Sequence, residues 1–434
     1  MPVSRNMSGC QVFFKERIPE CWECEPIGER IAFKYGVGLK EENRLPGKVC
    51  VYGSNGIVAY HNQAFLQGPG ILVGRKGTVG AVHYTEKTFW PIDTVYYIEL
   101  LKDDSLRFIY YLLDYLNLGK LNAATGVPGL SRRDALAIRG AFPPRDQQDE
   151  IAQILDAVDV AMNRTRTEID LSRRLREGLL RALLTQGVGL DGLIRDKKAD
   201  PDKFKNSKVG WVPEDWSISS VEQEFEIATG FTLNENRRPK VNKRQYLRVA
   251  NVQRNRILLD DIAELEATDA EMNGKRLEED DLLIVEGHAD PYAIGRCARV
   301  TPEAVGLTFQ NHLYRLRSRV INPQFACIWL NSQWVRRYWQ RMCATSSGLN
   351  TINQRKLKAL PIVLPPSSEQ KIITEIANSQ NAFIDSLQEC LSKIINLKRG
   401  LMQDLLTDKV RVNQPQAGVQ AKGQMNLPFM TARG

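Results

Sequence analysis

The chain has 434 residues, of which 43% are hydrophobic and 25% charged, so it is long enough to bury more than one hydrophobic core. Lys and Arg outnumber Asp and Glu by 59 to 51, and a formal charge of +8 favours a polyanionic partner over an acidic protein. There is no apolar run of about eighteen residues and no charged-then-apolar leader, so we expect no membrane span, no secretory signal and a cytoplasmic location. Eight scattered cysteines predict reduced thiols.

Short apolar runs separated by glycine-containing turns fill residues 49 to 100. They predict strands at 49–52, 57–60, 71–73, 79–83 and 94–100, and therefore a β-rich domain with helices around it. Tyr52, Asn55, Arg75 and Lys76 stand in or beside the turns. These four residues are candidates for contacts with nucleic acid.

A long amphipathic helix follows in the region 144–187, directly after Pro143-Pro144. Its apolar positions recur at steps of three and four residues, which is typical of a helix-packing seam, and include Ile151, Ile154, Leu179 and Leu183. Asp146 is the candidate N-cap of this helix. Residues 188–211 are predicted to be a linker.

A second β-rich domain is predicted over residues 212–364, with strands at 246–249, 282–285, 295–300 and 312–316. Near its start lies a dense set of basic residues with Asn and Tyr between them: Arg237, Arg238, Lys240, Lys243, Arg244, Arg254 and Arg256. Such residues suit contacts with phosphates and base edges. A solvated charged face is an equally good interpretation of this run alone.

A second long helix is predicted in the region 365–408, again after two prolines, with Ser367 or Ser368 as its cap. Its seam includes Ile373, Ile376, Phe383, Leu401 and Leu405. The remaining residues, 409–434, predict a flexible tail.

The organising feature of the chain is an internal repeat, since residues 130–185 align without a gap onto residues 352–407. A Pro-Glu-x-Trp segment also opens each unit, ending at Trp22 and Trp216. Two copies of a domain followed by a helix predict an α+β chain. In it, two β-rich α/β domains (1–143 and 212–364) are separated by two long antiparallel helices with internal pseudo-twofold symmetry.

Several catalytic and metal-binding patterns are missing from the sequence. There is no glycine-rich cofactor loop with an Asn/Asp-Pro-Pro-aromatic element; Asn322-Pro323-Gln324-Phe325 lacks the second proline. There is no phosphate loop of the ATPase type. Cys21 and Cys24 have no second pair at ligand spacing, and the four histidines show no metal-binding spacing. We therefore expect no catalytic residues, no metal site and no cofactor in this chain.

The order of these segments resembles the specificity subunits of type I restriction-modification systems. The resemblance is carried by residues 52–57, 71–77, 89–94 and 246–252 and by the two Pro-Pro helices, each with a nearby Gln. It implies that each domain is a target-recognition domain that reads one half of a bipartite, asymmetric site in double-stranded DNA, while the helices set the spacing. It also implies two modification subunits that bind S-adenosylmethionine and methylate adenine. Restriction subunits that use ATP and Mg for translocation and cleavage are implied as well.

Two other functions remain open on the sequence alone. One is a stand-alone DNA methyltransferase, for which the only support is the segment from Asn322 to Phe325. The other is a coiled-coil DNA-binding regulator that forms a homodimer and needs no other subunit. Binding of S-adenosylmethionine by the isolated chain would favour the first, and a lone homodimer would favour the second.

Overall fold

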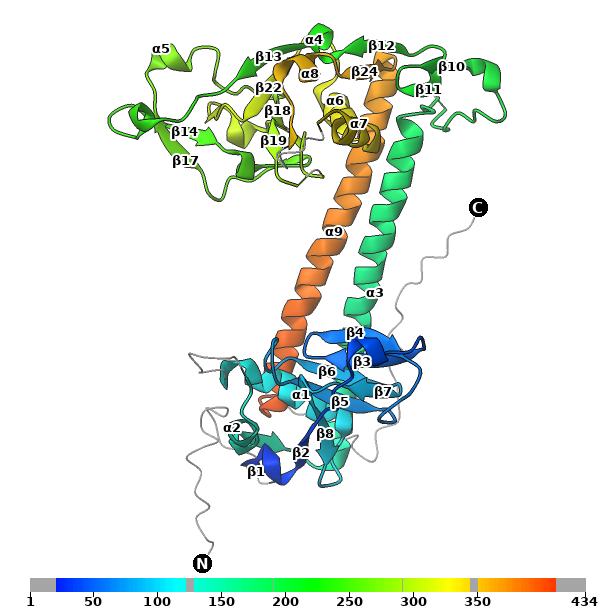
Figure 1. The fold of residues 1–434 in the computed structure, drawn as a ribbon, viewed down its shortest axis with the longest axis vertical. Coiled ribbons are helices and arrows are strands. Elements are labelled where there is room, and N and C mark those ends of the chain that lie inside the picture. Colours follow the sequence, from blue (N-terminus) through cyan, green and yellow to red (C-terminus); the bar gives the residue numbers. More distant parts are fainter. Residues whose placement is uncertain (1–20, 122–128, 190, 291, 344–349, 411–434) are drawn as a thin grey trace, which may run out of the picture. The chain divides into compact units, whose positions relative to one another are not determined.

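A computed structural model describes residues 21–121, 129–189, 191–290, 292–343 and 350–410. The chain divides into two compact units: unit 1 contains residues 1–166 and 389–434, and unit 2 contains residues 167–388 (Figure 1). Two long helices, α3 (Arg145–Leu183) and α9 (Ser367–Leu406), are divided between the units. Unit 1 contains the start of α3 and the end of α9, and unit 2 contains the end of α3 and the start of α9. The tail predicted to be flexible lies almost entirely outside the described residues.

Unit 1 is built on a four-stranded sheet, a three-stranded sheet and a two-stranded ribbon. The strand orders are β2-β8-β5-β6, β4-β3-β7 and β1-β9. Their bounds are β1 Glu23–Pro26, β2 Ile31–Tyr35, β3 Val49–Gly53, β4 Gly56–His61, β5 Gly70–Gly74, β6 Val82–Thr85, β7 Phe89–Pro91, β8 Val95–Leu100 and β9 Arg139–Phe142. Two further helices are α1 (Leu106–Leu116) and α2 (Arg132–Ala137).

Unit 2 repeats this strand order with different residues. Its main sheets have the orders β13-β22-β18-β20, β17-β14-β21 and β12-β24, and three smaller ribbons are added. The bounds are β10 Phe204–Ser207, β11 Gly210–Pro213, β12 Ser217–Ser220, β13 Phe225–Thr229, β14 Lys243–Leu247, β15 Val252–Gln253, β16 Arg256–Ile257, β17 Ala263–Glu266, β18 Leu282–Val285, β19 Gly287–His288, β20 Cys297–Arg299, β21 Thr308–Phe309, β22 Leu313–Ser318, β23 Asn350–Thr351 and β24 Pro361–Leu364. The helices are α4 Val221–Glu224, α5 Asp269–Met272, α6 Pro323–Leu330, α7 Gln333–Cys343 and α8 Gln354–Lys358.

The two units match even in the direction of strand pairing. The middle strand of each three-stranded sheet pairs antiparallel with one neighbour and parallel with the other, as β3 does with β4 and β7 and β14 does with β17 and β21. The two domains therefore share one architecture although their strands differ in sequence. Such a match is typical of a duplicated domain whose surface has diverged.

Each core contains apolar residues from both long helices. In unit 1, Ile151 and Leu155 of α3 belong to one buried cluster with Leu405 and Leu406 of α9. In unit 2, Leu183 of α3 belongs to one buried cluster with Ile373 of α9. The helix ends are therefore part of the domain cores and are not merely attached to them.

All nine predicted strands are present, with ends shifted by up to three residues. The predicted linker 188–211 is folded: it contains β10, and Val188 and Val209 are buried in the core of unit 2. Phe383, which the predicted seam included, is 53% exposed. Six cysteines at 21, 50, 297, 327, 343 and 390 are free, but Cys24 is disulfide-bonded, so the prediction of a reduced thiol is wrong there. No helix among the described residues is long and apolar enough to cross a membrane.

The predicted caps of the long helices are wrong by one or two residues. Asp146 lies inside the first turn of α3, and Ser367 is the first residue of α9. The carbonyls of Pro144 and Pro366 accept the first helical hydrogen bonds, from the amides of Gln148 and Gln370 at 3.0 and 2.9 Å. The second proline of each pair thus stands where a cap was expected.

Candidate nucleic-acid interface

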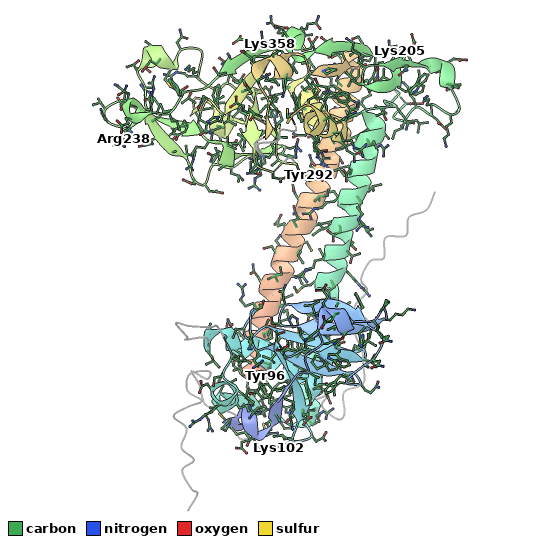
Figure 2. All side chains as sticks on the ribbon, in the orientation of Figure 1. Tyr96, Lys102, Lys205, Arg238, Tyr292 and Lys358 are labelled. Atoms are coloured by element: carbon green, nitrogen blue, oxygen red, sulfur yellow. The ribbon has the colours of Figure 1, made fainter. Side chains whose placement is uncertain are left out.

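The basic run of unit 2 lies on β14, β16 and the loops next to them, and Arg238 marks its outer part in Figure 2. Most of these side chains are paired with carboxylates of the same unit. The pairs are Arg237 with Glu271 at 2.7 Å, Arg238 with Glu235 at 3.6 Å, Lys243 with Glu264 at 3.8 Å and Arg244 with Asp269 at 3.1 Å. This pairing favours the interpretation of the run as a solvated charged face.

The same pairs do not prevent binding to phosphate. Exposed ion pairs contribute at most about 1 kcal/mol each, so a phosphate can replace a carboxylate partner at small cost. Lys240 and Arg256 are exposed, and Lys240 follows a turn in which the carboxylate of Glu266 accepts hydrogen bonds from the amides of residues 240, 241 and 242. Those three bonds lower the pKa of Glu266 and fix the loop that presents Lys240.

Arg254 differs from the four ion-paired residues of the run because the hydrogen-bond partners of its guanidinium group are neutral. Its guanidinium donates to the side-chain oxygen of Asn331 at 3.2 Å and to the carbonyl of Tyr292 at 2.6 Å. Arg254 therefore faces a pocket next to α7, away from the ion pairs around β14.

In unit 1 the four candidates are not equivalent. Asn55 and Lys76 are exposed in turns, as a contact residue requires, whereas Tyr52 is 7% exposed and packs edge-on against Phe89. Arg75 donates to the carbonyl of Asp93 at 2.9 and 2.6 Å, which fixes the direction of its side chain. Tyr52 is consequently a core residue in this structure.

One group near Arg75 was not found from the sequence. The guanidinium groups of Arg75 and Arg132 lie 5.3 and 5.4 Å from the ring centre of Tyr35, which is 51% exposed. Stacked Arg and Tyr side chains suit contacts with bases and phosphates. No local pattern reveals this group, because its three members come from distant parts of the sequence.

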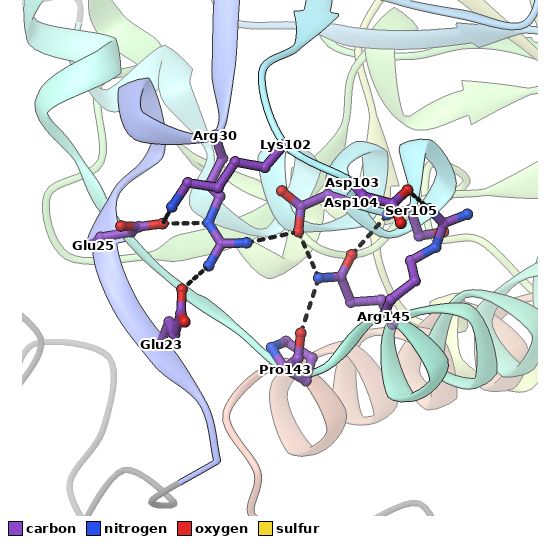
Figure 3. A network of polar contacts seen from close by, with 10 residues as sticks. Glu23, Glu25, Arg30, Lys102, Asp103, Asp104, Ser105, Pro143 and Arg145 are labelled. Atoms are coloured by element: carbon purple, nitrogen blue, oxygen red, sulfur yellow. Dashed lines mark hydrogen bonds and ion pairs between the residues drawn. The ribbon is translucent and has the colours of Figure 1, made fainter.

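The start of each long helix is joined to its own domain by one buried glutamine. Gln148 accepts a hydrogen bond from the amide of Ser105 at 2.8 Å and donates to Asp104 at 2.7 Å and to the carbonyl of Pro143 at 2.9 Å. Figure 3 shows this network continuing from Asp104 to Arg30, which is also paired with Glu23 and Glu25. The helix, the two prolines and the residue before α1 are thereby held together.

Unit 2 repeats this junction at equivalent positions. Gln370 accepts from the amide of Asn322 at 3.0 Å and donates to the carbonyl of Pro365 at 2.9 Å. Ser105 and Asn322 are the N-cap residues of α1 and α6, so each glutamine ties a long helix to the first helix after the main sheet. Asn322 also accepts from the amide of Phe325 at 2.9 Å, so the segment that resembled half of a methyltransferase motif is a helix cap.

The tryptophans of the two Pro-Glu-x-Trp segments also make equivalent contacts. The indole nitrogen of Trp22 donates to Gln147 at 3.2 Å, and that of Trp216 donates to Glu369 at 3.0 Å. Gln147 and Glu369 occupy the same place in the repeat. The repeat thus preserves the way in which each domain holds its helix.

The residues predicted to pair the helices lie in the two cores. Ile151, Ile154, Leu401 and Leu405 belong to or pack against the core of unit 1. Leu179, Leu183, Ile373 and Ile376 do the same in unit 2. Each set contains residues from both helices, and each position in one set has its repeat equivalent in the other.

Two domains of one topology, each holding its helix through the same junction but carrying different surface residues, define a protein built from a duplicated domain-plus-helix unit. Residues 24–171 and 213–395 match the family described as the type I restriction modification DNA specificity domain. The chain belongs to this family.

Similar proteins include the type I restriction enzyme MjaVIII specificity subunit of Methanocaldococcus jannaschii, which is 23% identical over 92% of this chain and 96% of that protein. The StySPI specificity subunit of Salmonella potsdam is 23% identical over 68% of this chain, and the match spans 61% of its length. Among solved structures, the S subunit of the type I restriction-modification system from M. genitalium has a TM-score of 0.55, at 16% identity over 90% of this chain and 97% of that one. That likeness shows the fold.

Proposed function

We propose that this chain is the DNA sequence-recognition and assembly subunit of a type I restriction-modification complex. The observation that carries the proposal is the duplication itself: two domains share a strand order and a helix junction, while the residues in their turns differ. One chain then offers two different reading surfaces. Each domain reads one half of a bipartite, asymmetric DNA site.

In this proposal, α3 and α9 form an antiparallel pair with pseudo-twofold symmetry and set the spacing between the half-sites. The core of each unit, which contains the start of one helix and the end of the other, supports this arrangement. A helix of 39 residues is about 58 Å long at 1.5 Å per residue. Half-sites one turn apart are separated by roughly 34–36 Å, so the helices are long enough to serve as a spacer.

The chemistry is assigned to partner subunits. Two modification subunits supply S-adenosylmethionine and methylate adenine, and restriction subunits use ATP and Mg to translocate and cut the DNA. The exposed apolar residues of the long helices, such as Leu175 and Leu397, offer places for those subunits to pack. The complex acts in the cytoplasm, where its DNA substrate lies.

The test replaces residues 213–360 with the corresponding region of a relative that directs methylation to another site. The complete complex is purified from the native host, and methylated adenines are mapped by sequencing. One half of the recognised site should change and the other half should stay the same. A chimera that folds and assembles but changes both halves, or neither, would contradict the modular assignment.

A further inference from the structure

A concave pocket lies in unit 2 where α3, α7 and the turn between β15 and β16 meet. Its volume is about 510 Å³. Trp329 and Trp334 line it, with ring centres 5.5 Å apart and planes inclined by 22°, and Trp211 contributes a third, half-exposed ring. A cavity of this size with aromatic walls is typical of a site for a small ligand or for part of a larger one.

The charge of the lining is strongly one-sided. Among the described residues, seven arginines line the pocket and Glu177 is the one acidic residue. Arg173, Arg176 and Arg181 come from α3, and Arg336, Arg337 and Arg341 come from α7. Arg254 completes the set from the β15–β16 turn.

The guanidinium groups of the lining differ in their partners: Arg173 is paired with Asp170 at 3.8 Å, whereas the hydrogen-bond partners of Arg254 are neutral. Arg254 donates to neutral oxygens of Asn331 and Tyr292, and burial together with the nearby Arg336 and Arg296 lowers its pKa to about 10. Burial also lowers the pKa of Arg176, although Asp385 and Glu177 oppose that effect.

Two nitrogen atoms of the lining arginines also lack partners among the described residues. Within the described part of the chain, the Nε atoms of Arg176 and Arg336 are buried without a hydrogen-bond partner. The pair of Arg336 with Glu177, at 3.5 Å, uses the one acidic group of the lining. One carboxylate thus leaves most of the positive charge of the lining unbalanced, and a bound anion would offset it.

The internal repeat allows a comparison with unit 1, where the cation at the equivalent position has a carboxylate partner. Lys398 stands at the repeat position of Arg176 and is paired with Asp159 at 2.7 Å, with Asp114 also acting on this group. The hydroxyl of Tyr111 lies 2.6 Å from a carboxylate oxygen of Asp156 and 2.8 Å from one of Asp159. In unit 1, Asp159 and Asp114 thus act on Lys398, while Asp156 is paired with a second cation, Arg107.

Unit 2 has an amide at each of these three places. Asn378 and Asn381 are the repeat equivalents of Asp156 and Asp159. Asn331 follows the cap of α6 by nine residues, as Asp114 follows the cap of α1. Asp385, at the repeat position of Asn163, acts on Arg176 and replaces one of the three lost carboxylates, but the added arginines leave an excess of positive charge in the pocket.

We propose that this pocket binds a ligand that carries several phosphate groups. The planar fork of a guanidinium group matches two phosphate oxygens, and a set of arginines on opposite walls can hold more than one phosphate at once. The phosphates come either from the backbone of DNA or from a free polyphosphate. The DNA source rests on the proposed function, whereas binding of free polyphosphate does not depend on it.

Calorimetric titration of the full-length chain with inorganic tripolyphosphate tests the proposal. We expect saturable binding to one site, which weakens as salt is added. The double variant Arg337→Gln, Arg341→Gln removes two exposed arginines of the rim and should weaken binding at least tenfold. The matched control, Arg174→Gln with Arg355→Gln, removes two exposed arginines outside the lining and should bind as the wild type does.

A second variant tests the comparison between the two units without removing an arginine. Asn381→Asp restores the carboxylate that unit 1 has at this repeat position, and we expect it also to weaken binding of tripolyphosphate severalfold. Absence of saturable binding by the wild type, or equal weakening in the rim variant and its control, would overturn the proposal.

Competition then identifies the source of the phosphates. If a short DNA duplex displaces tripolyphosphate from the wild type, the pocket contacts the DNA backbone. If both bind at once, its ligand is a free polyphosphate. The chimera experiment tests the proposed function through the methylated site and does not depend on polyphosphate binding. The absence of polyphosphate binding would therefore overturn the proposal for the pocket and leave the proposed function untouched.

Discussion

At the scale of single residues, the most informative side chains are two buried glutamines rather than the charged surface. Gln148 and Gln370 are 1% and 7% exposed, and each closes the junction between a long helix and the domain before it. A glutamine amide suits this position because it both donates and accepts, so it can join a carbonyl on one side to an amide on the other.

Replacement of Gln148 by Leu should lower the free energy of unfolding by about 3 kcal/mol, because the Ser105 amide, the Pro143 carbonyl and Asp104 lose a buried partner. Urea denaturation measures the loss. The control is Gln153→Leu, at an exposed position of the same helix, which should change stability by about 0.5 kcal/mol or less. Equal losses in the two variants would show that the junction contributes nothing specific.

The sequence indicated these glutamines, since both recur in the repeat after Pro-Pro, but it did not indicate what they bind. Their partners, Ser105 and Asn322, differ in type and contribute a backbone amide, which no side-chain pattern can reveal. For the basic run, the sequence showed the residues themselves but not the side chains that pair with them. Its residues were easy to find, yet the carboxylates that pair with them lie on β17 and α5, which only the fold brings close.

At the scale of elements, each long helix serves two cores. The start of α3 lies in unit 1 and its end in unit 2, and α9 does the reverse. Periodicity predicted both helices and their apolar positions because spacing at three and four residues is a local property. It could not predict that these positions pack mainly into domain cores, nor that Phe383 is exposed, because the partner surfaces come from distant segments.

This arrangement makes an unusual prediction for Leu405. Leu405→Ala should destabilise unit 1 by about 2–5 kcal/mol, although residue 405 lies far along the chain from the strands of that unit. Hydrogen exchange should become faster in the sheet formed by residues 31–100, whereas Leu183→Ala should instead affect residues 282–318 of unit 2.

The exposed pair Leu175→Ala and Leu397→Ala provides the control for both leucine variants. These residues occupy equivalent positions and are 65% and 55% exposed, so their loss should leave exchange in both sheets almost unchanged. Faster exchange in unit 2 after Leu405→Ala would contradict the assignment of the α9 end to the core of unit 1.

At the scale of the whole molecule, the repeat makes the two halves interchangeable in principle. Leu179, Leu183 and Leu184 in the first half are the equivalents of Leu401, Leu405 and Leu406 in the second. A fragment of residues 1–187 therefore contains the domain of unit 1 without the end of α9 that completes its core. It also contains the end of α3 without the core of unit 2 against which that end packs.

We expect this fragment to form a homodimer in which each copy supplies the missing helix end of the other. Sedimentation measures its mass. A shorter fragment, residues 1–166, lacks the three leucines and should not dimerise in this way, and Leu183→Ala in the longer fragment should weaken the dimer. A monomeric 1–187 fragment with a stable fold would refute the interchangeability of the halves.

The core of unit 1 cannot be completed until the end of α9 has been synthesised. Unit 1 needs Leu405, yet about 250 residues separate it from Leu155 in the same core. Translation at 5–20 residues per second needs about 12–50 s to cover that stretch. The nascent first domain therefore waits with an apolar surface uncovered until the last helix is synthesised, and slower translation lengthens the interval in which it can aggregate or be bound by a chaperone.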